Sequence, residues 1–206
     1  NNNGTGIVTE ARTGATINAV VAGNISTNNT LDGFVGRADG GTYNLASMTG
    51  NTFSNNLSNG AFIHFLNGGV FNAVSEDLDG DGTLDPGEDL NGNGNLDQGI
   101  VTNTMNQNSI AGLCIFGEDA STGAFDIGGP APALGNSFLG NTFAGVATDL
   151  RDTSTAQIDA LFNTISGGTS GPASLTIVLD FIDAGQAGFV DPFGEPLDPF
   201  DVTNYG

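Results

Sequence analysis

The sequence predicts an all-β fold in which short parallel strands repeat as the coils of a solenoid. Three features recur in order: a glycine followed by apolar residues at intervals near 27 residues, then an alternating apolar pair, then an Asn that precedes an apolar residue. With 206 residues, of which 38% are apolar, the chain is long enough to bury the core of one such domain.

The first element of the repeat is the glycine with its apolar run. Its members are separated by 27, 27, 52 and 33 residues, and an insertion of about 25 residues would account for the longest interval. A sixth member near Gly171 leads into the apolar run 175–179. The five clear members are Gly6-Ile7-Val8, Gly33-Phe34-Val35, Gly60-Ala61-Phe62-Ile63, Gly112-Leu113-Cys114-Ile115 and Gly145-Val146-Ala147.

The second and third elements complete a coil of three short strands joined by Gly, Asn and Ser turns. The apolar pairs of the second element alternate with a period of two, as strands do. These pairs are Ile17 with Ala19, Tyr43 with Leu45, Phe71 with Ala73, Phe125 with Ile127, and Ile158 with Ala160. The Asn residues of the third element are Asn24, Asn51, Asn103, Asn136 with Asn141, and Asn163.

Such a coil cannot bury its apolar side chains alone, so we expect coils to stack with each strand parallel to its equivalent in the next coil. Asn suits the corners because it tolerates left-handed backbone angles, and stacked Asn side chains can hydrogen-bond along the axis as an amide ladder. An antiparallel sandwich is the alternative. Hairpin signals such as Asn67-Gly68 favour it, but they do not explain the 26- to 27-residue phase.

Residues 50–62 (GNTFSNNLSNGAF) and 135–147 (GNSFLGNTFAGVA) resemble coils of right-handed parallel β-helix proteins of the pectate-lyase-like superfamily. The resemblance covers residues 6 to about 180. It implies a right-handed parallel β-helix of about six coils over residues 1–183, followed by an extended tail, 184–206. It does not imply an activity, because this scaffold carries lyases, hydrolases, adhesins and inert fibres.

The interval of 52 residues contains a predicted calcium-binding insertion, residues 75–99. Calcium loops of twelve residues place oxygen ligands at positions 1, 3, 5, 7, 9 and 12 and a glycine at position 6. The first segment matches completely, with its ligands at Asp77, Asp79, Asp81, Thr83, Asp85 and Glu88 and its glycine at Gly82. The second segment is partial, with Asp89, Asn91, Asn93, Asn95 and Asp97 as ligands, and Ile100 stands at position 12, where the last carboxylate should be.

We therefore expect one firm calcium site and a second, weaker one, because amide ligands lower the ligand charge. The alternative is an acidic loop that binds no ion. The flanking residues 70–75 and 100–105 are short and β-like, so a calcium switch made of two helices is not expected. Over residues 77–97 the insertion resembles the calcium loops of thrombospondin type 3 repeats and dockerins.

The formal charge of −20 excludes some partners. Three Arg, no Lys and 23 acidic residues would repel nucleic acid and anionic membrane surfaces. No apolar run is long enough to span a membrane, so no membrane insertion is expected. Weak calcium sites stay filled at the millimolar calcium found outside cells, which predicts an extracellular location, secreted or at the cell surface. The start at Asn1 suggests a processed product, and Cys114 is expected to be a small strand residue.

No residue set predicts catalysis. Arg12, Arg37 and Arg151 could bind a sugar acid, but we favour surface pairs with Glu10, Asp39 or Asp152. Asp180 and Asp183 could form an acid–base pair, but a spacing of three puts them on opposite faces of a strand. His64 is expected to point outward, without a nucleophile beside it.

The ends of the predicted solenoid indicate how the chain works. Residues 1–5 lead directly into the first coil, so we expect another subunit or domain to cover that end. The acidic tail 184–206, with aromatic and Pro residues, could cap its own last coil or reach a neighbour. We therefore expect an extracellular structural protein that self-associates into a filament, sheath, surface layer or adhesin. The alternative is a β-helix protein that binds or degrades glycans.

Overall fold

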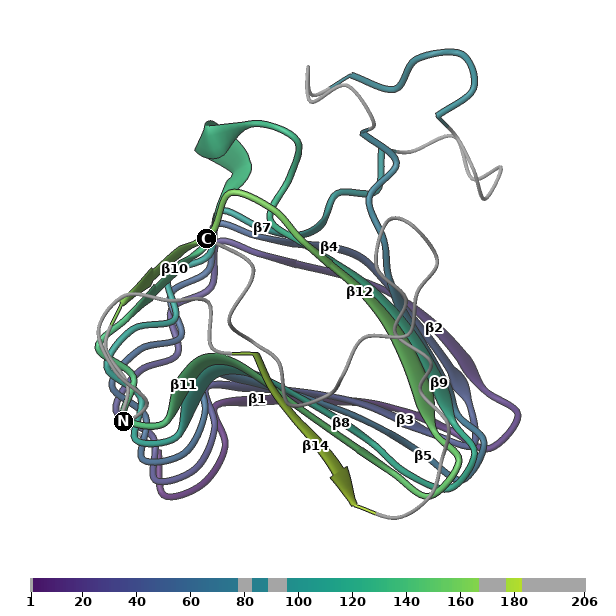
Figure 1. The fold of residues 1–206 in the computed structure, drawn as a ribbon, viewed down its shortest axis with the longest axis horizontal. Helices are drawn as coiled ribbons and strands as arrows, with labels where there is room; N and C mark the ends of the chain where they lie inside the picture. The colour runs from purple at the N-terminus through teal and green to yellow at the C-terminus, as the bar shows by residue number, and fades with distance from the viewer. Residues whose placement is uncertain (1, 78–82, 89–95, 167–176, 183–206) are drawn as a thin grey trace.

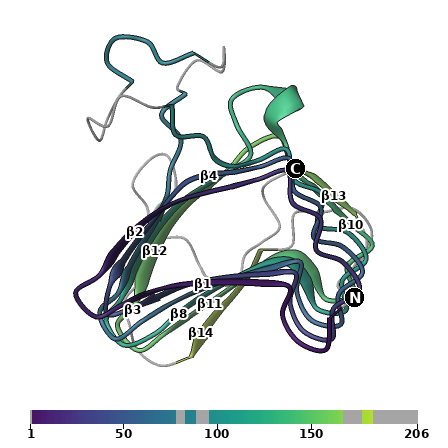
Figure 2. The same ribbon diagram turned by 180° about the vertical axis from the view of Figure 1, so that it is seen from behind.

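The fold is all-β, and all pairings between its named strands are parallel (Figures 1 and 2). The computed structural model describes residues 2–77, 83–88, 96–166 and 177–182. Its elements are β1 (Ile7–Arg12), β2 (Thr16–Ala22), β3 (Phe34–Asp39), β4 (Thr42–Thr49), β5 (Ala61–Leu66), β6 (Val70–Ala73), β7 (Gly99–Val101), β8 (Ala111–Gly117), β9 (Thr122–Ile127), the 3₁₀ helix η1 (Pro132–Leu134), β10 (Ser137–Leu139), β11 (Ala144–Arg151), β12 (Thr155–Ala160), β13 (Thr164–Ser166) and β14 (Ile177–Ile182).

Strands from equivalent positions of the repeat lie side by side. The first sheet has the order β1-β3-β5-β8-β11-β14, and the second has the order β12-β9-β6-β4-β2, with β7 also pairing with β4 and β9. A third, narrower row consists of β10 and β13, extended by parallel bridges through Thr104 and Thr52 to Ile25. This topology is compatible with a parallel β-helix. The antiparallel sandwich is wrong, because the sheets contain no antiparallel strand pair among the described residues.

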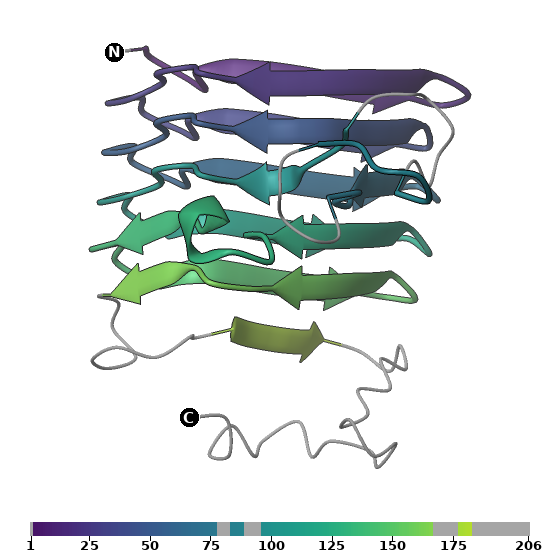
Figure 3. The same ribbon diagram turned by 90° about the horizontal axis from the view of Figure 1, so that it is seen from above.

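We call the residues from one phased glycine to the next a layer: 6–32, 33–59, 60–111 and 112–144, with a further layer that begins at residue 145. Figure 3 shows these layers stacked along one axis. The expected phase of the first four intervals is confirmed, because Ile7, Phe34, Ala61, Leu113 and Val146 are consecutive partners in the first sheet. The interval of 33 residues reflects a longer connection that contains η1.

The phased glycines are needed because the layers approach closely there. A Cβ added to Gly33 would lie 2.6 Å from the carbonyl oxygen of Gly60, and one added to Gly60 would lie 2.6 Å from that of Gly112. A real Cβ does not fit at such distances, so each glycine permits the contact with the next layer. Steric contact, rather than a left-handed backbone, explains these residues, since none of them has a positive φ.

The predicted sixth start is wrong in register. Gly171 lies 26 residues after Gly145 in the sequence and outside the described residues. In the structure, β14 pairs with β11 so that Ile177 lies opposite Val146, an interval of 31 residues. The chain therefore uses five more residues than the phase predicts before it returns to the first sheet.

The second sheet corrects the alignment of the second element after Phe71. Phe71 lies opposite Gly123, and Ala73 lies opposite Phe125, a shift of two residues from the predicted equivalence. The Phe125 ring nevertheless stacks on the Phe71 ring, with centroids 5.7 Å apart, and an added Cβ on Gly123 would meet the Phe125 ring at 2.5 Å. Gly123 therefore leaves the space in which the Phe125 ring packs.

The insertion divides one strand position of the second sheet. β6 precedes it and pairs with β4 at residues 42–44, whereas β7 follows it and pairs with β4 at residues 47–49. The short β-like flanks predicted from the sequence are thus strands of the sheet. The described residues 83–88 of the insertion lie outside this sheet (Figure 1).

The main hydrophobic core is one cluster that extends between the sheets, and Ala111, Ala144 and Ala147 form a second, smaller cluster. Aromatic rings form a row along the axis, in which Tyr43 stacks on Phe71 at 4.6 Å and Phe65 lies 5.8 Å from Phe125. A second contact joins Phe34 and Phe53 at 5.8 Å. The contacts of Tyr43, Phe71, Phe65 and Phe125 thus pack the layers that begin at residues 33, 60 and 112 on one another through large, fully buried side chains, which contribute both apolar burial and aromatic contact energy.

Candidate functional site

The predicted calcium ligands belong to the insertion, and the structure describes only part of them. Five are among the described residues: Asp77, Thr83, Asp85, Glu88 and Asp97. The other six, Asp79, Asp81, Asp89, Asn91, Asn93 and Asn95, lie outside the described residues. Within the described ranges no group of three or more His, Cys, Asp or Glu side chains is arranged around a common point.

Two ligand positions of the first loop are brought together by a turn. The backbone N–H of Asp85 donates to Glu88 Oε2 at 2.9 Å, and the backbone N–H of Glu88 donates to the carbonyl oxygen of Asp85 at 3.0 Å. These are positions 9 and 12 of the predicted loop. The turn therefore fixes the Glu88 carboxylate beside the backbone of the other ligand residue.

The base of the insertion is closed by backbone contacts. Ser75 and Gln98 form an antiparallel bridge, and the N–H of Glu76 donates to the carbonyl oxygen of Asp97 at 2.7 Å. The Ser75 N–H also donates to the carboxylate of Asp126 in β9. Burial raises the pKa of Asp126, and the Ser75 hydrogen bond opposes that shift. These contacts attach the insertion to the sheet below it.

Four carboxylates of this region are buried. The exposed fractions of Glu76, Asp77, Glu88 and Asp97 are 1%, 3%, 7% and 8%. Burying a carboxylate is costly unless a cation or hydrogen bonds compensate. Oxygen donors of this kind suit Ca²⁺.

An amide ladder runs along the corner after the second sheet, as the sequence predicts. In each step the backbone N–H and the Nδ2 of one Asn both donate to the Oδ1 of the Asn in the next layer, at 2.9–3.0 Å. The members after the first also donate from Nδ2 to backbone carbonyl groups within or beside the core. The ladder consists of Asn24, Asn51, Asn103, Asn136 and Asn163.

The expected left-handed backbone at these Asn residues is wrong. In the first ladder the positive φ belongs instead to the residue before the Asn. The φ angles of these residues lie between 51° and 63° at Gly23, Gly50, Thr102 and Phe162. The corner turns at that residue, and the Asn that follows is left in a backbone conformation from which its amide points along the axis. Asn28, Asn55 and Gln107 do adopt the left-handed conformation, at the next corner.

A second amide ladder was not recognised from the sequence. It has the same pattern, in which N–H and Nδ2 donate together to the next Oδ1, at 2.9–3.1 Å. The signal was present, because each member follows a first-ladder Asn by five residues. Its members, Asn29, Asn56, Asn108 and Asn141, are each at most 3% exposed.

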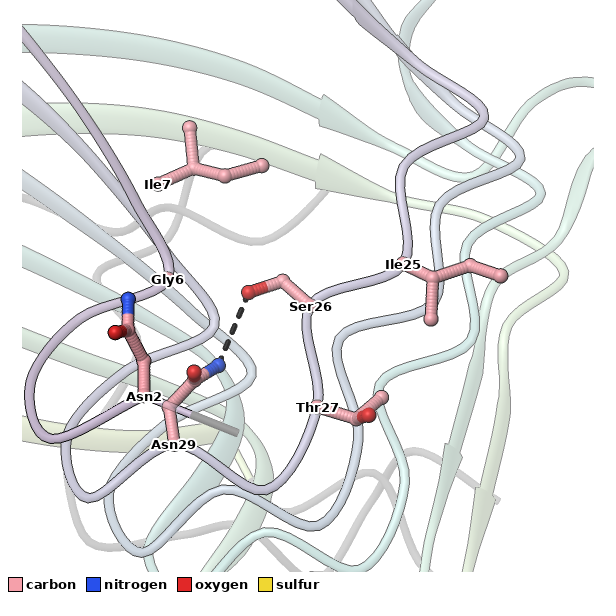
Figure 4. Close-up of a pocket in the computed structure, with 7 residues that line it drawn as sticks. All are labelled: Asn2, Gly6, Ile7, Ile25, Ser26, Thr27 and Asn29. Atoms are coloured by element: carbon pink, nitrogen blue, oxygen red, sulfur yellow. Dashed lines mark hydrogen bonds between the residues drawn. The ribbon is translucent and has the colours of Figure 1, made fainter.

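Both ladders begin at the N-terminal layer. There β1 and β2 each have one neighbouring strand among the described residues, and the inward side chains Ile7, Ile17 and Ala19 are only partly buried. A shallow pocket of about 340 Å³ lies at this end, lined by Asn2, Gly6, Ile7, Ile25, Ser26, Thr27 and Asn29. In Figure 4, Asn29 Nδ2 donates to Ser26 Oγ, at 3.0 Å, within this pocket.

The outer face of the first sheet holds the three Arg and His64. Arg12 pairs with Glu10 at 2.8 Å, and Arg37 pairs with Glu10 at 3.4 Å and with Asp39 at 3.5 Å, as expected. Arg151 pairs with Asp149 at 2.7 Å, so the suggested partner Asp152 is wrong. Arg12 and Arg37 do not occupy equivalent positions, since Arg37 lies opposite Glu10 and Arg12 lies opposite Asp39.

His64 points outward, as predicted, and its Nε2 lies 2.9 Å from Glu118 Oε1. Burial lowers its pKa, although Glu118 acts in the opposite direction. Phe116 lies beside it, with ring centroids 4.9 Å apart, and the Arg151 guanidinium lies 4.7 Å from the centre of the Phe116 ring.

The first sheet also holds the other residues considered for chemistry that the structure describes. Cys114 is a strand residue opposite Phe62, and burial raises its pKa to about 12. Asp180 lies opposite Asp149 in the register of β14, whereas Asp183 is outside the described residues. No described helix is both long and apolar enough to cross a membrane.

Comparison of the chain with protein-family models, with curated protein sequences and with solved structures finds no significant match.

Proposed function

We propose that this chain is a structural subunit of an extracellular assembly, a filament, sheath, surface layer or adhesin. In this proposal it is a right-handed parallel β-helix of about six coils, related in architecture to the pectate-lyase-like superfamily, with a calcium-binding insertion like that of thrombospondin type 3 repeats. Copies stack end to end. The observation that carries the proposal is that two directional amide ladders run to an N-terminal layer whose strands have no outer neighbour among the described residues.

The ladders support head-to-tail stacking because they have a direction. Every donor pair belongs to the layer nearer the N-terminus and every acceptor to the layer nearer the C-terminus. The first layer therefore presents the Oδ1 atoms of Asn24 and Asn29 outward, as acceptors. Another parallel layer placed against them would extend each ladder by one step, provided that it supplies N–H and amide donors at the same positions.

The partly exposed core of the first layer supports the same arrangement. Ile7, Ile17 and Ala19 point toward the axis, but they pack on only one neighbouring layer in the described structure. A second copy that covers these side chains would bury their apolar surface, and such burial stabilises a contact by about 25 cal/mol per Å². Stacking subunits of a solenoid bury their exposed ends in this way.

Calcium binding is the second part of the proposal. Carboxylate, amide and hydroxyl side chains at ligand spacing fall in the insertion, and oxygen donors of these kinds suit Ca²⁺. When bound, Ca²⁺ would be held by carboxylate, amide and backbone oxygens of residues 77–97. The asparagine ligands of the second segment make that site the weaker one. Sites of modest affinity are filled in the millimolar calcium outside cells, which is the basis for the extracellular location.

Electron microscopy of the purified chain, with calcium and with a chelator, tests the assembly. We expect polymers in calcium that shorten or disappear in the chelator. Ile17→Glu places a carboxylate within the stacked end and should abolish end-to-end polymers, whereas Val20→Glu, with the same charge on the outer face of the same strand, should not. A chain that stays monomeric at high concentration in calcium would contradict the proposal.

Glycan binding is the second candidate function, with polysaccharide cleavage as its enzymatic form. The outer face of the first sheet supports it, because aromatic rings (Phe62 and Phe116) lie beside polar groups (His64 and Arg151) there. Such a surface can stack a sugar ring and hydrogen-bond its hydroxyl groups. Binding to an array of neutral and acidic oligosaccharides that is lost in Phe116→Ala, in a chain that remains monomeric, would favour this function over assembly.

A further inference from the structure

We propose that one corner of the stack is a lateral contact surface for a second copy of this chain. The surface is formed by Leu31, Leu57, Ile110 and Phe143, which we call the corner stripe. These residues lie in the connections between the third element of one layer and the first strand of the next, such as the loop between β10 and β11 (Figure 1). This contact is separate from end-to-end stacking and does not depend on it.

Backbone hydrogen bonds place the stripe residues in adjacent layers. The N–H of Leu57 donates to the carbonyl oxygen of Asn29 at 3.0 Å, two residues before Leu31. The N–H of Ile110 donates to the carbonyl oxygen of Ser58 at 3.0 Å, next to Leu57, and the N–H of Phe143 donates to that of Ile110 at 2.9 Å. Each of the first four layers thus contributes one residue to the stripe. With about 4.8 Å between neighbouring strands, it extends about 15 Å along the axis.

The stripe side chains are large, apolar and exposed to solvent. Their exposed fractions are 52% for Leu31, 65% for Leu57, 43% for Ile110 and 44% for Phe143. The other exposed large apolar residues of the described chain belong to the first layer, the layer that begins at residue 145, or the flank of the insertion: Val8, Val20, Ile25, Val74, Leu161 and Phe162. Only the corner stripe has such a residue in each of four consecutive layers, two residues after the second-ladder Asn at Leu31, Ile110 and Phe143 and one residue after it at Leu57. Exposed apolar side chains that gather on one face are typical of an interaction surface.

The charge distribution indicates what can bind there. The segments 24–31, 51–63, 103–113 and 136–148 contain the corner and have no charged residue other than the flanking Asp32, although the chain carries a formal charge of −20. A cationic partner would be attracted to the acidic surfaces instead. A second copy would be repelled by those surfaces, so it would meet the first with least repulsion where both are uncharged.

The repeating geometry also suits an identical partner. Two stripes with equal spacing can interdigitate their side chains, and a two-fold axis would make the contact self-complementary. Four half-exposed side chains supply only part of the ~800 Å² per partner that stable interfaces bury, so the contact between single chains is weak. Stacking of chains would multiply the contacts along the axis and strengthen it.

Sedimentation of the Ile17→Glu chain, whose ends are blocked, tests the proposal. We expect a concentration-dependent dimer, and at least a tenfold lower association constant when Leu57→Ser and Phe143→Ser are added. Val20→Ser is the matched control, since Val20 is 69% exposed but lies outside the stripe, and it should leave association unchanged. Circular dichroism and thermal unfolding of each variant confirm that the fold is retained.

Three outcomes would overturn the proposal. These are a strictly monomeric end-blocked chain at the highest soluble concentration, association that survives Leu57→Ser with Phe143→Ser, and an equal loss of association in Val20→Ser. A monomer in which the stripe substitutions make residues 184–206 more sensitive to protease would show instead that the chain's own tail covers the stripe. Electron microscopy of the native chain tests end-to-end stacking, whereas sedimentation of the end-blocked chain tests the lateral contact. The failure of one proposal therefore does not decide the other.

Discussion

Asn51 and Asn103 are 52 residues apart in the sequence and are consecutive members of one amide ladder. The backbone N–H and the Nδ2 of Asn51 donate to Asn103 Oδ1 at 3.0 and 2.9 Å. The insertion therefore leaves the stack and returns without interrupting it. A long excursion between two layers costs little when the flanking residues hold their register, because loop entropy grows slowly with length.

Asn103→Ala should lower the free energy of unfolding by about 3 kcal/mol. Asn103 Nδ2 donates to the carbonyl oxygens of Met48 and Val101, and its Oδ1 accepts both donors of Asn51, so the substitution leaves several buried groups without partners. Urea unfolding measures the loss. Asn44→Ala is the control, because Asn44 belongs to a ladder on the solvent-facing side of β4, and we expect a loss below about 1 kcal/mol. Equal losses would contradict a special role for the buried ladder.

Gly60→Ala should destabilise the chain by about 2–3 kcal/mol or more, because the new Cβ would meet backbone oxygens of Gly112 and Phe53, which cannot move independently. Gly4→Ala is the matched control, since nothing lies within 4 Å of a Cβ there, and its effect should stay within about 0.5 kcal/mol. Thermal and urea unfolding measure both variants. A Gly60→Ala chain as stable as the native one would show that the layers are not held in close contact at the phased glycines.

The stability of the chain should fall in acid partly because of His64. Its folded pKa lies below the ordinary value of 6.5, since burial disfavours the imidazolium more than Glu118 favours it. As the pH falls, His64 of the unfolded chain therefore becomes protonated at a higher pH than His64 of the folded chain. The contribution of neutral His64 is fully present above about pH 6.5 and is lost as the pH falls through the folded pKa.

NMR titration measures this pKa directly, because the chain has a single His. Glu118→Gln removes the opposing interaction and should lower the pKa further. His64→Asn should remove the corresponding part of the pH dependence of urea unfolding between pH 7 and 5. A His64 pKa above 6.5 in the native chain would contradict the assigned cause.

Asp77→Ala with Glu88→Ala should abolish the tighter calcium site and the stabilisation that calcium provides. An ion that binds only the folded loop stabilises it by about 2.7 kcal/mol at a hundredfold excess over its Kd. Calorimetric titration and thermal unfolding, with and without calcium, measure the two effects. Asp119→Asn with Asp152→Asn removes two exposed carboxylates elsewhere, and this variant should keep both the calcium binding and the stabilisation by calcium. The absence of binding heat from the native chain would end the calcium proposal.

The repeat was predictable because close steric contact and local hydrogen bonding restrict which residues its positions can hold. A glycine is the only residue that fits where two layers touch, and an Asn amide carries both a donor and an acceptor that match its own copy one layer away. Gly33 with Gly60 and Asn24 with Asn51 therefore keep the same interval and reveal the phase. The calcium loop was predicted from the ligand spacing that such an ion requires, and it stays a prediction.

The sequence by itself determined the parallel stacking of β elements, the first ladder and the position of the insertion, because these depend on residue types that repeat in phase. The tertiary structure decided the details that depend on space left by other layers. The Phe125 ring fills the space above Gly123 rather than keeping the register of Phe71, and β14 pairs five residues later than the phase predicts. A side chain packs wherever a neighbouring layer leaves room, and that room does not exist until the layers are assembled.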